Sequence, residues 1–313
     1  MVDEPRSDLV MIVDTDISKA KGLAELYGSK MCSDNFEEAI RNPDIDAVYI
    51  ATPVFLHSEQ AIEAIKAGKH VICEKPLALD YGSALKVVET AQESNVKSTT
   101  AYFRRFSPKY LFSRELITKG IFEKILLIRM CYHTWFQASP QSPLFWRTQK
   151  HLSGGGIIFD MGSHMFDVLI GLFGLPVRVF AKMRNLVFDY SVEDSSAIIM
   201  EYENGMLVTA SFNWNSRTYA HEFEIIGDHA KLRWIPYDGD KITLVTGSQT
   251  QELEKPNYKN VHYPLIEDFV SAIIENRSPV VSMEEAARTN LLMETCYISS
   301  QQSKEIDLKE LHK

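Results

Sequence analysis

The sequence predicts two domains: an α/β domain with a doubly wound parallel sheet, followed by an α+β domain with an antiparallel sheet. The first hundred residues alternate short apolar runs with helix-like segments over short links, which is the pattern of right-handed βαβ units. Later in the chain the hydrophobic period switches to two and an Asn-Gly hairpin signal appears. A length of 313 residues suits two domains. We place the boundary near Phe103, which gives domains of residues 1–103 and 104–313.

The expected strands of the first domain are apolar on both faces, as in a parallel sheet covered on both sides. They span residues 9–13, 47–52, 70–73 and 97–102. Helices are expected between them, at residues 17–27, 35–41, 57–68 and 81–94. Sites in such sheets lie beyond the carboxyl ends of the strands. That rule places Asp14, residues 52–57 and residues 74–76 at the expected site.

The second domain is expected to be richer in strands. Apolar alternation predicts strands at residues 124–133, 221–227, 231–235 and 241–245, with turns at Asn204-Gly205 and Asp238-Gly239. A mostly apolar helix is expected over residues 157–174, and amphipathic helices over 266–276 and 284–299.

Composition excludes several classes of protein. The hydrophobic fraction of 45% and the charged fraction of 24% are those of a globular chain, not a disordered one. With 33 Lys and Arg against 42 Asp and Glu, the net charge is −9, so we expect no nucleic-acid partner. No apolar run is long enough to predict a membrane span, and the start lacks a secretion segment. Four well-separated cysteines without a C-x-x-C pair predict buried thiols in the cytoplasm, without disulfides or metal.

The apolar helix carries Asp160 and His164, which are four residues apart and therefore share a face. Such groups are costly to bury unpaired. Three glycines at residues 154–156 precede them and allow another segment or a ligand to approach the backbone closely. From the spacing alone, a catalytic pair and a structural polar pair are equally favoured. Two ligands without a third do not favour a metal site.

Two other groups follow strands of the first domain. Glu74-Lys75-Pro76 places an ammonium group beside an acid, which suits acid–base work or stabilisation of an oxyanion, and the Lys75–Pro76 bond is a candidate for cis geometry. The alternative is an ordinary solvated turn. Asp14 stands where nucleotide-binding sheets place an acid that accepts hydrogen bonds from the ribose hydroxyls. It equally fits common turn chemistry.

Several longer segments resemble the Gfo/Idh/MocA oxidoreductases, a superfamily that includes glucose–fructose oxidoreductase and inositol dehydrogenase. The segment AVYIATPVFLHSEQAIEAIKAGKHVICEKPLAL is similar to the core of its first domain. FWR, LSGGGIIFDMGSHMFDVL, VEDSSAIIMEYENG, FEIIGDHAKL and FVSAIIENRSPVVSMEEAART follow in the family's order. The resemblance covers nearly the whole chain from Leu9 onward. It implies a Rossmann-like domain and an α/β domain whose large open sheet forms the interface of a homo-oligomer.

The resemblance also implies site residues. Lys75, Asp160 and His164 match the family's catalytic group. Asp14, Thr52, Pro53, His57, Glu74, Trp146 and Arg147 match positions near the cofactor, and Arg104 and Tyr263 are candidates for the substrate pocket. The implied activity is hydride transfer between NAD or NADP and a hydroxyl carbon of a sugar, polyol or cyclitol. Asp14 favours NAD, because its charge repels a 2′-phosphate.

These residue types suit that chemistry. Histidine exchanges protons near neutral pH, so His164 is a plausible acceptor of the hydroxyl proton. Asp160 would orient His164 or bind a hydroxyl, and Lys75 would stabilise the developing alkoxide. Two other functions remain open on the same scaffold: a non-catalytic ligand sensor or regulatory protein, and NAD-dependent cleavage of glycosides. The cofactor supplies the redox step in the catalytic cases.

The chain departs from the family pattern in two places. Val54 stands where the family often has asparagine. More importantly, the opening strand and the G-x-G-x-x-G loop are absent before Leu9. That strand lies at the centre of the 3-2-1-4 order, so its loss leaves two unpaired strand edges and removes the pyrophosphate-binding loop. Three explanations are open: a shortened sequence, a natural variant that re-pairs its sheet, or a protein that has left catalysis. We favour the first.

Overall fold

The computed structural model describes residues 3–310 and divides them into two compact units. The first comprises the described residues up to Ala78, Gly82–Phe103 and Asn260–Ala287, and the second comprises Leu79–Tyr81, Arg104–Lys259 and the described residues from Arg288 on. One division therefore falls at Phe103. The segment 260–287, which the sequence division assigned to the second domain, returns to the first unit. It is held there by Thr99, whose hydroxyl donates to the Val281 carbonyl oxygen at 2.6 Å.

The first unit contains parallel strands connected by helices, as the sequence predicts. The strands are β1 (Met11–Val13), β2 (Met31–Ser33), β3 (Ala47–Ile50), β4 (His70–Cys73) and β5 (Ser98–Thr100). The helices are α1 (Ile17–Tyr27), α2 (Phe36–Arg41), α3 (Val54–Lys66), α4 (Tyr81–Gln92) and α8 (Tyr263–Ile274). Local signals set the helix ends: Asp16 and Asn35 accept backbone hydrogen bonds as N-caps, and Gly28 ends α1 in the left-handed conformation.

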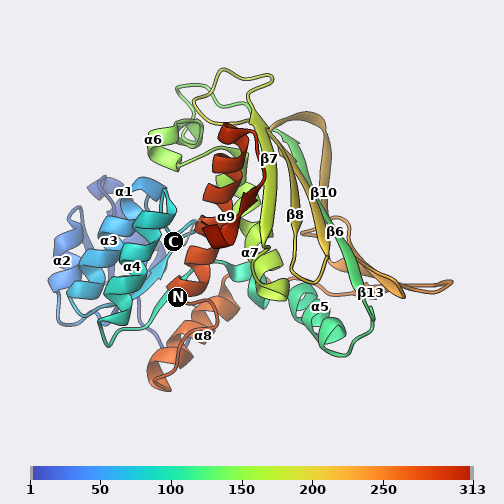
Figure 1. Cartoon of the computed structure of the whole chain (residues 1–313). Coiled ribbons are helices and arrows are strands. Elements are labelled where there is room, and N and C mark those ends of the chain that lie inside the picture. Colours follow the sequence, from blue (N-terminus) through green and yellow to red (C-terminus); the bar gives the residue numbers. More distant parts are fainter. Residues whose placement is uncertain (1–2, 311–313) are drawn as a thin grey trace. The chain divides into compact units, whose positions relative to one another are not determined.

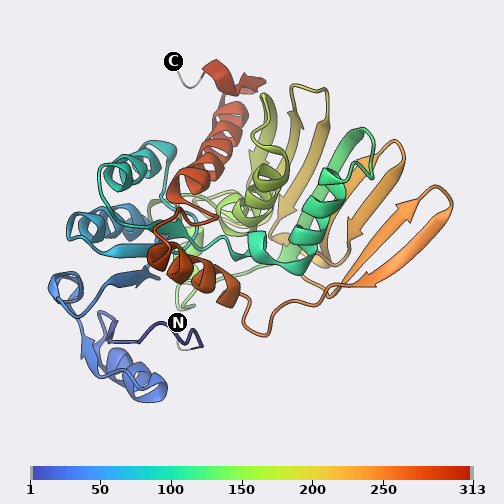
Figure 2. The same cartoon turned by 90° about the horizontal axis from the view of Figure 1, so that it is seen from below.

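The parallel strands form two sheets instead of one. β1 pairs with β2, and β3, β4 and β5 form a separate sheet in that order (Figure 2). Among the residues that the structure describes, no strand joins β1 to β3. The predicted pair of open strand edges is thus confirmed. β1 and β3 each have a paired strand on one side only. On the other side, no described strand exchanges backbone hydrogen bonds with them.

Open edges predict uneven protection of the backbone. We expect amide hydrogens in β1 and β3 to exchange with solvent faster than those in β4, which has a hydrogen-bonded neighbour on each side. Hydrogen–deuterium exchange followed by mass spectrometry measures this difference, with β4 as the internal reference. Equal protection of β1 and β4 would contradict the split sheet.

The residues along one face of α1 are only partly covered. Ala20 and Ala24 are buried, but Leu23 is 40% and Tyr27 is 51% exposed. The two-stranded sheet beneath α1 is too narrow to cover a whole helix face.

The described part of the second unit is built on a nine-stranded sheet in the order β13-β12-β11-β10-β6-β9-β8-β7-β14. All neighbours are antiparallel except β6 and β9, which run parallel, so the sheet is mixed. The predicted hairpin turn at Asn204-Gly205 joins β8 and β9. The strands are β6 (Ile125–Trp135), β7 (Arg178–Arg184), β8 (Ser195–Glu201), β9 (Leu207–Asn213), β10 (Asn215–Gly227), β11 (Ala230–Trp234), β12 (Lys241–Thr246), β13 (Gln249–Glu254) and β14 (Ile306–Asp307).

Helices cover one face of this large sheet (Figures 1 and 2). These are α5 (Pro108–Thr118), which the sequence analysis missed, α7 (Ser163–Phe173) and the second-unit part of α9 (Met283–Gln302). A short helix, α6 (Lys150–Ser153), precedes α7. Side chains from α5, α7, α9 and the strands form one apolar core. Alternate residues of the strands point to the other face, and along β8 they are exposed.

Two details concern the apolar residues. The helical stretch Lys150–Phe173 is long and apolar enough to cross a membrane, but 72% of its apolar window is buried within the protein, as in a core helix.

The prediction of four buried thiols is wrong for Cys32 and Cys131, which are only partly buried. Cys131 lies on β6, where the alternation of strand side chains turns it away from the core residues Met130 and Ile128.

Candidate active site

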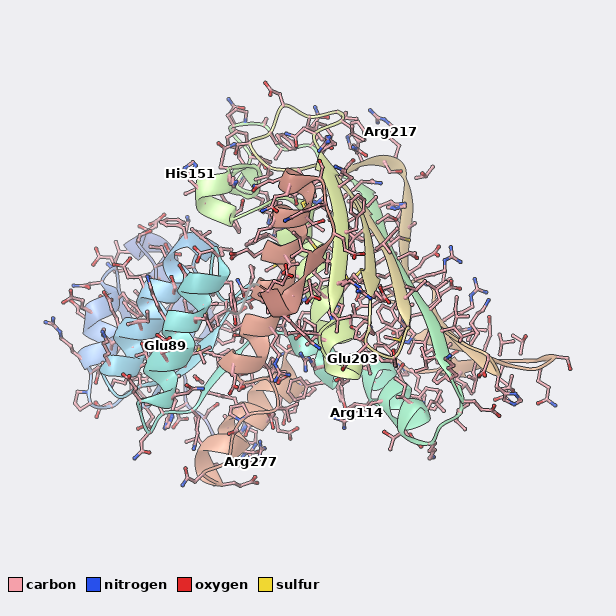
Figure 3. All side chains as sticks on the ribbon, viewed as in Figure 1. Glu89, Arg114, His151, Glu203, Arg217 and Arg277 are labelled. Atoms are coloured by element: carbon pink, nitrogen blue, oxygen red, sulfur yellow. The ribbon has the colours of Figure 1, made fainter. Side chains whose placement is uncertain are left out.

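Charged residues are mostly exposed, and Figure 3 shows labelled examples such as Glu89, Arg114 and Arg217 projecting from the surface. The buried charged residues are therefore informative, because burying a charge is costly without a partner. Several of them lie close to the residues that the sequence analysis selected. No group of three His, Cys, Asp or Glu side chains within residues 3–310 is arranged to hold a metal ion.

In the first unit, Glu74 organises the carboxyl end of β4. The Tyr49 hydroxyl, from the neighbouring strand β3, donates to Glu74 Oε1 at 2.7 Å, and the Lys75 backbone N–H donates to Oε2 at 3.2 Å. Burial and the nearby Glu74 charge raise the pKa of Tyr49, so its hydroxyl stays protonated as a donor. The Lys75–Pro76 bond is cis, as expected. The start of the Glu-Lys-Pro turn is therefore held by hydrogen bonds.

His57 links the turns that follow β3 and β4. Its ring is 1% exposed, and Nδ1 lies 2.8 Å from the Pro76 carbonyl oxygen while Nε2 lies 2.8 Å from that of Thr52. The Thr52 hydroxyl donates to Gln60 on α3 at 2.7 Å. Burial lowers the pKa of His57, although both carbonyl oxygens favour its protonated form. His57 thus positions Thr52 and the Lys75–Pro76 turn through backbone contacts.

Asp14 and Tyr263 lie elsewhere in the first unit. Asp14 follows β1 and is partly buried, and its Oδ1 accepts a hydrogen bond from the Asp16 backbone N–H at 2.8 Å. Tyr263 begins α8, and burial, together with the nearby charges of Glu267 and Glu4, raises its pKa. The residue before it, His262, was not selected from the sequence, yet its Nε2 lies 3.8 Å from Glu74 Oε1. The sequence analysis could not find this contact, because His262 and Glu74 are far apart along the chain.

In the second unit, Arg147 meets Asp160. Trp146 and Arg147 lie in the 3-10 turn Phe145–Thr148, and the Arg147 guanidinium lies 5.7 Å from the centre of the Trp146 ring. Arg147 Nη1 lies 3.4 Å from Asp160 Oδ1, and both side chains are partly exposed. The structure therefore brings together three residues that the sequence placed near the reaction: Trp146, Arg147 and Asp160.

The helix that bears Asp160 and His164 begins with a wider turn than expected. Residues 158–162 form a π-helical turn that includes Asp160, and α7 continues from Ser163 with His164 7% exposed. Such π turns are frequent at functional sites. Asp167, farther along α7, is fully buried and pairs with Arg105, whose Nη2 lies 2.8 Å from Asp167 Oδ1. This third polar group of the apolar helix is therefore a structural ion pair.

A buried glutamate that the sequence analysis did not select caps this π turn. Glu193 accepts hydrogen bonds from the backbone N–H groups of Gly156 and Ile158, each at 3.1 Å, and from the Tyr297 hydroxyl at 2.6 Å. The carboxylate is thus placed at a helix N-terminus, where it satisfies otherwise unpaired donors. Burial raises the pKa of Glu193 despite these donors.

The glycines before the helix are required by this packing. A Cβ atom on Gly155 would lie 2.0 Å from the Tyr297 hydroxyl oxygen, and one on Gly156 would lie 2.0 Å from the Glu193 carbonyl oxygen. The expected close approach to the backbone is therefore made by Glu193 and Tyr297 of the same chain. Only glycine leaves room for both contacts.

Each unit thus contains some of the site residues that the sequence analysis selected. The first unit holds Asp14, Thr52, Pro53, His57, Glu74, Lys75 and Tyr263, and the second holds Arg104, Trp146, Arg147, Asp160 and His164. Arg104, expected near substrate, is 8% exposed and forms an ion pair with Asp238. The sequence analysis missed Glu193 and Asp238. Glu193 lies two residues before strand β8, within the segment VEDSSAIIMEYENG that resembles the family.

Comparison with known proteins agrees with both units. Residues 1–102 match the model of an oxidoreductase family with an NAD-binding Rossmann fold, and residues 110–233 match the GFO/IDH/MocA C-terminal domain. Oxidoreductase P35 of Formosa agariphila is 30% identical over 295 residues, which cover 92% of this chain and 89% of the relative. D-glucoside 3-dehydrogenase of Escherichia coli is 26% identical over 328 residues, which cover 96% and 90%.

A solved structure shows the same fold. Levoglucosan dehydrogenase in complex with NADH and levoglucosan aligns with a TM-score of 0.89 at 25% identity, covering 95% of this chain and 90% of that one. The parallel strands, the large mixed sheet and the two domain matches lead to one assignment. The protein belongs to the Gfo/Idh/MocA family of oxidoreductases.

Proposed function

We propose that this oxidoreductase transfers a hydride between NAD and a hydroxyl carbon of a sugar, polyol or cyclitol. The observation that carries the proposal is the Asp160–Arg147 contact on the helix that also bears His164. Relatives named for sugars support it: levoglucosan dehydrogenase was solved with NADH and levoglucosan, and another relative is D-glucoside 3-dehydrogenase. Those names describe the relatives, and they guide the choice of compounds to test.

The residues of the first unit fit two ends of NAD. Asp14 at the end of β1 suits the adenosine ribose, and Thr52, Pro53 and Glu74 at the ends of β3 and β4 suit the nicotinamide side. The pyrophosphate is not matched: within residues 3–310, no glycine-rich loop follows a parallel strand, and β1 is followed by Asp14-Thr15-Asp16. Two carboxylates at that turn do not favour an anion.

The roles of the chain's own residues follow from their charges. When bound, the nicotinamide supplies the hydride acceptor. We assign His164 as the acceptor of the hydroxyl proton, with Asp160 orienting it or binding a hydroxyl group. Lys75 stabilises the alkoxide charge through its ammonium group. Trp146, against Arg147, belongs to the nicotinamide side in this proposal.

The test has two parts. Titration with NADH, with energy transfer from tryptophan to the nicotinamide as the signal, is expected to saturate, and Trp146→Phe is expected to weaken the signal. NAD turnover is then measured with levoglucosan, glucose, a methyl glucoside and myo-inositol. A chain that neither binds NADH nor oxidises any of these compounds would not be a dehydrogenase.

A sugar sensor on the same scaffold is the second candidate. That function needs no cofactor. It predicts binding of a neutral sugar without saturable NADH binding. Ligand-observed NMR on the same protein sample separates the two functions.

A further inference from the structure

A polar cluster lies in the second unit around Asp238, in the turn between β11 and β12. We call it the Asp238 cluster; it consists of Arg104, Tyr132, Tyr219, His221 and Asp238. The chain brings these residues together from the 3-10 turn Phe103–Phe106, from strands β6 and β10, and from the β11–β12 turn. Tyr132 and His221 face each other as direct neighbours in the β6–β10 ladder.

The carboxylate of Asp238 is held in one orientation. Arg104, which is 8% exposed, donates from Nε to Oδ1 at 3.1 Å and from Nη2 to Oδ2 at 2.8 Å. This two-pronged pairing is the strong geometry for an arginine and a carboxylate. Burial raises the pKa of the Asp238 carboxyl, but the Arg104 charge and hydrogen bonds outweigh it, so the pKa is lowered. Asp238 is therefore ionised at neutral pH.

The turn that carries Asp238 is also fixed. Lys109, on α5 and 1% exposed, donates from Nζ to the carbonyl oxygens of Pro236 at 3.1 Å and Tyr237 at 2.8 Å. Both bonds reach the residues directly before Asp238. Yet the Asp238 side chain is 50% exposed, so part of its carboxylate faces solvent. This combination of a fixed backbone, a buried counter-ion and an accessible carboxylate is the geometry of a binding group.

Aromatic side chains form the rest of the cluster. The Tyr132 ring lies 4.8 Å from that of His221 and 6.1 Å from that of Tyr219, both edge to face. The Tyr219 hydroxyl lies 3.2 Å from His221 Nδ1. Burial lowers the pKa of His221 to about 4, although the Asp238 charge opposes this, so the ring is neutral at pH 7. The cluster thus presents phenol groups and a neutral imidazole beside one carboxylate.

Tyr132 connects this cluster to the proposed reaction centre. Its pKa is raised by burial and, next, by the negative charge of Asp160; Asp238 adds a smaller effect of the same sign. The phenol therefore lies within electrostatic reach of both carboxylates.

The charges of these groups select a ligand. Three cations near the two acids are already engaged. Arg104 pairs with Asp238 and Arg147 with Asp160, while Lys109 donates to the two backbone carbonyl oxygens before Asp238. An ionised carboxylate accepts hydrogen bonds and repels another anion. Its accessible oxygen suits the hydroxyl groups of a sugar or cyclitol, and aromatic rings suit the apolar faces of such rings.

We propose, building on the proposed function, that the Asp238 cluster binds the hydroxyl groups at the non-reacting end of a neutral polyhydroxylated ring. Because its carboxylate is negatively charged, Asp238 repels sugar acids and sugar phosphates and so excludes them. Asp238 would thus determine the substrate class while Asp160, His164 and Lys75 act on the reacting hydroxyl. In this proposal Arg104, expected from the sequence near substrate, acts on the substrate through Asp238.

The main test is Asp238→Asn. Loss of a charged acceptor is expected to raise the KM for the best neutral sugar by about 10- to 100-fold, with a smaller change in kcat. Because Arg104 then keeps an unbalanced charge, the variant is expected to gain binding of gluconate and glucose 6-phosphate. A merely structural role does not predict this exchange of preference. Ligand-observed NMR with NADH present measures binding of the same compounds independently of turnover.

Two further variants distinguish a loss of ligand binding from a folding defect. Asp240→Asn removes the neighbouring acid of the same turn, whose Oδ1 accepts from the Asn257 backbone N–H, and is expected to keep the wild-type preference. Tyr132→Phe removes one hydroxyl and is expected to weaken neutral-sugar binding without new anion binding. If Asp238→Asn does not fold, loss of neutral-sugar binding in Tyr132→Phe supports the proposal, and unchanged binding overturns it.

The outcomes separate this inference from the proposed function. Turnover of neutral sugars with an unchanged KM in Asp238→Asn overturns the inference and keeps the function. Asp238-dependent binding without any turnover keeps the inference and overturns the function. A wild-type preference for sugar acids or phosphates, or no binding of any neutral sugar, overturns the inference.

Discussion

Replacing Lys75 with alanine is expected to lower turnover by about 10²- to 10³-fold, because the alkoxide then develops without a nearby positive charge. NADH binding is expected to remain, since the Thr52 and Glu74 contacts do not involve the lysine side chain. Steady-state rates on the best neutral sugar, together with the tryptophan energy-transfer titration, separate the two effects. Lys75→Arg keeps the charge but changes its geometry, and should fall between wild type and alanine.

The matched control is Lys66→Ala, which removes an exposed lysine at the end of α3 in the same unit. It is expected to behave as wild type in both measurements. Unchanged turnover in Lys75→Ala would remove Lys75 from the mechanism. Loss of NADH binding together with turnover would make Lys75 a binding group instead.

Glu193→Ala is expected to lower the free energy of unfolding by about 3 kcal/mol or more. The variant leaves the Gly156 and Ile158 N–H groups and the Tyr297 hydroxyl without their buried acceptor. Because these donors begin the turn that carries Asp160, turnover is expected to fall as well. Urea unfolding followed by tryptophan fluorescence measures the stability change.

Glu203→Ala, an exposed acid in the β8–β9 turn, is the control and should change stability little. Tyr297→Phe removes one hydroxyl from the same network and is expected to cost less than Glu193→Ala. A loss below about 1 kcal/mol in Glu193→Ala would show that water replaces the carboxylate. In that case Glu193 would not position the turn.

Local patterns predicted much of the fold. The strand at residues 70–73 appears as β4 with the same bounds, because its apolar residues and flanking polar groups are contiguous. The Asn204-Gly205 turn likewise needs only its own backbone conformation, with Gly205 at a positive φ. The helix with Asp160 and His164 was found from its apolar composition, although its first turn is π-helical.

Other features depend on contacts between distant residues. The parallel pairing of β6 with β9, the return of 260–287 to the first unit, and the Glu193 cap involve partners far apart in sequence. Helix α5 was missed because its apolar stripe is weak and its burial comes from the sheet it covers. No window of the sequence contains both members of such a pair.

The sequence by itself determined the alternation of strands and helices, the family motifs and the identity of the candidate catalytic residues. It also predicted the open edges at β1 and β3 of the described residues. Only the tertiary structure decided that Arg104 is balanced by Asp238 and that Glu193 holds the turn of Asp160. The reason is physical: composition and period reflect local burial and backbone preference, whereas the charge felt at a site depends on which distant groups the fold places beside it.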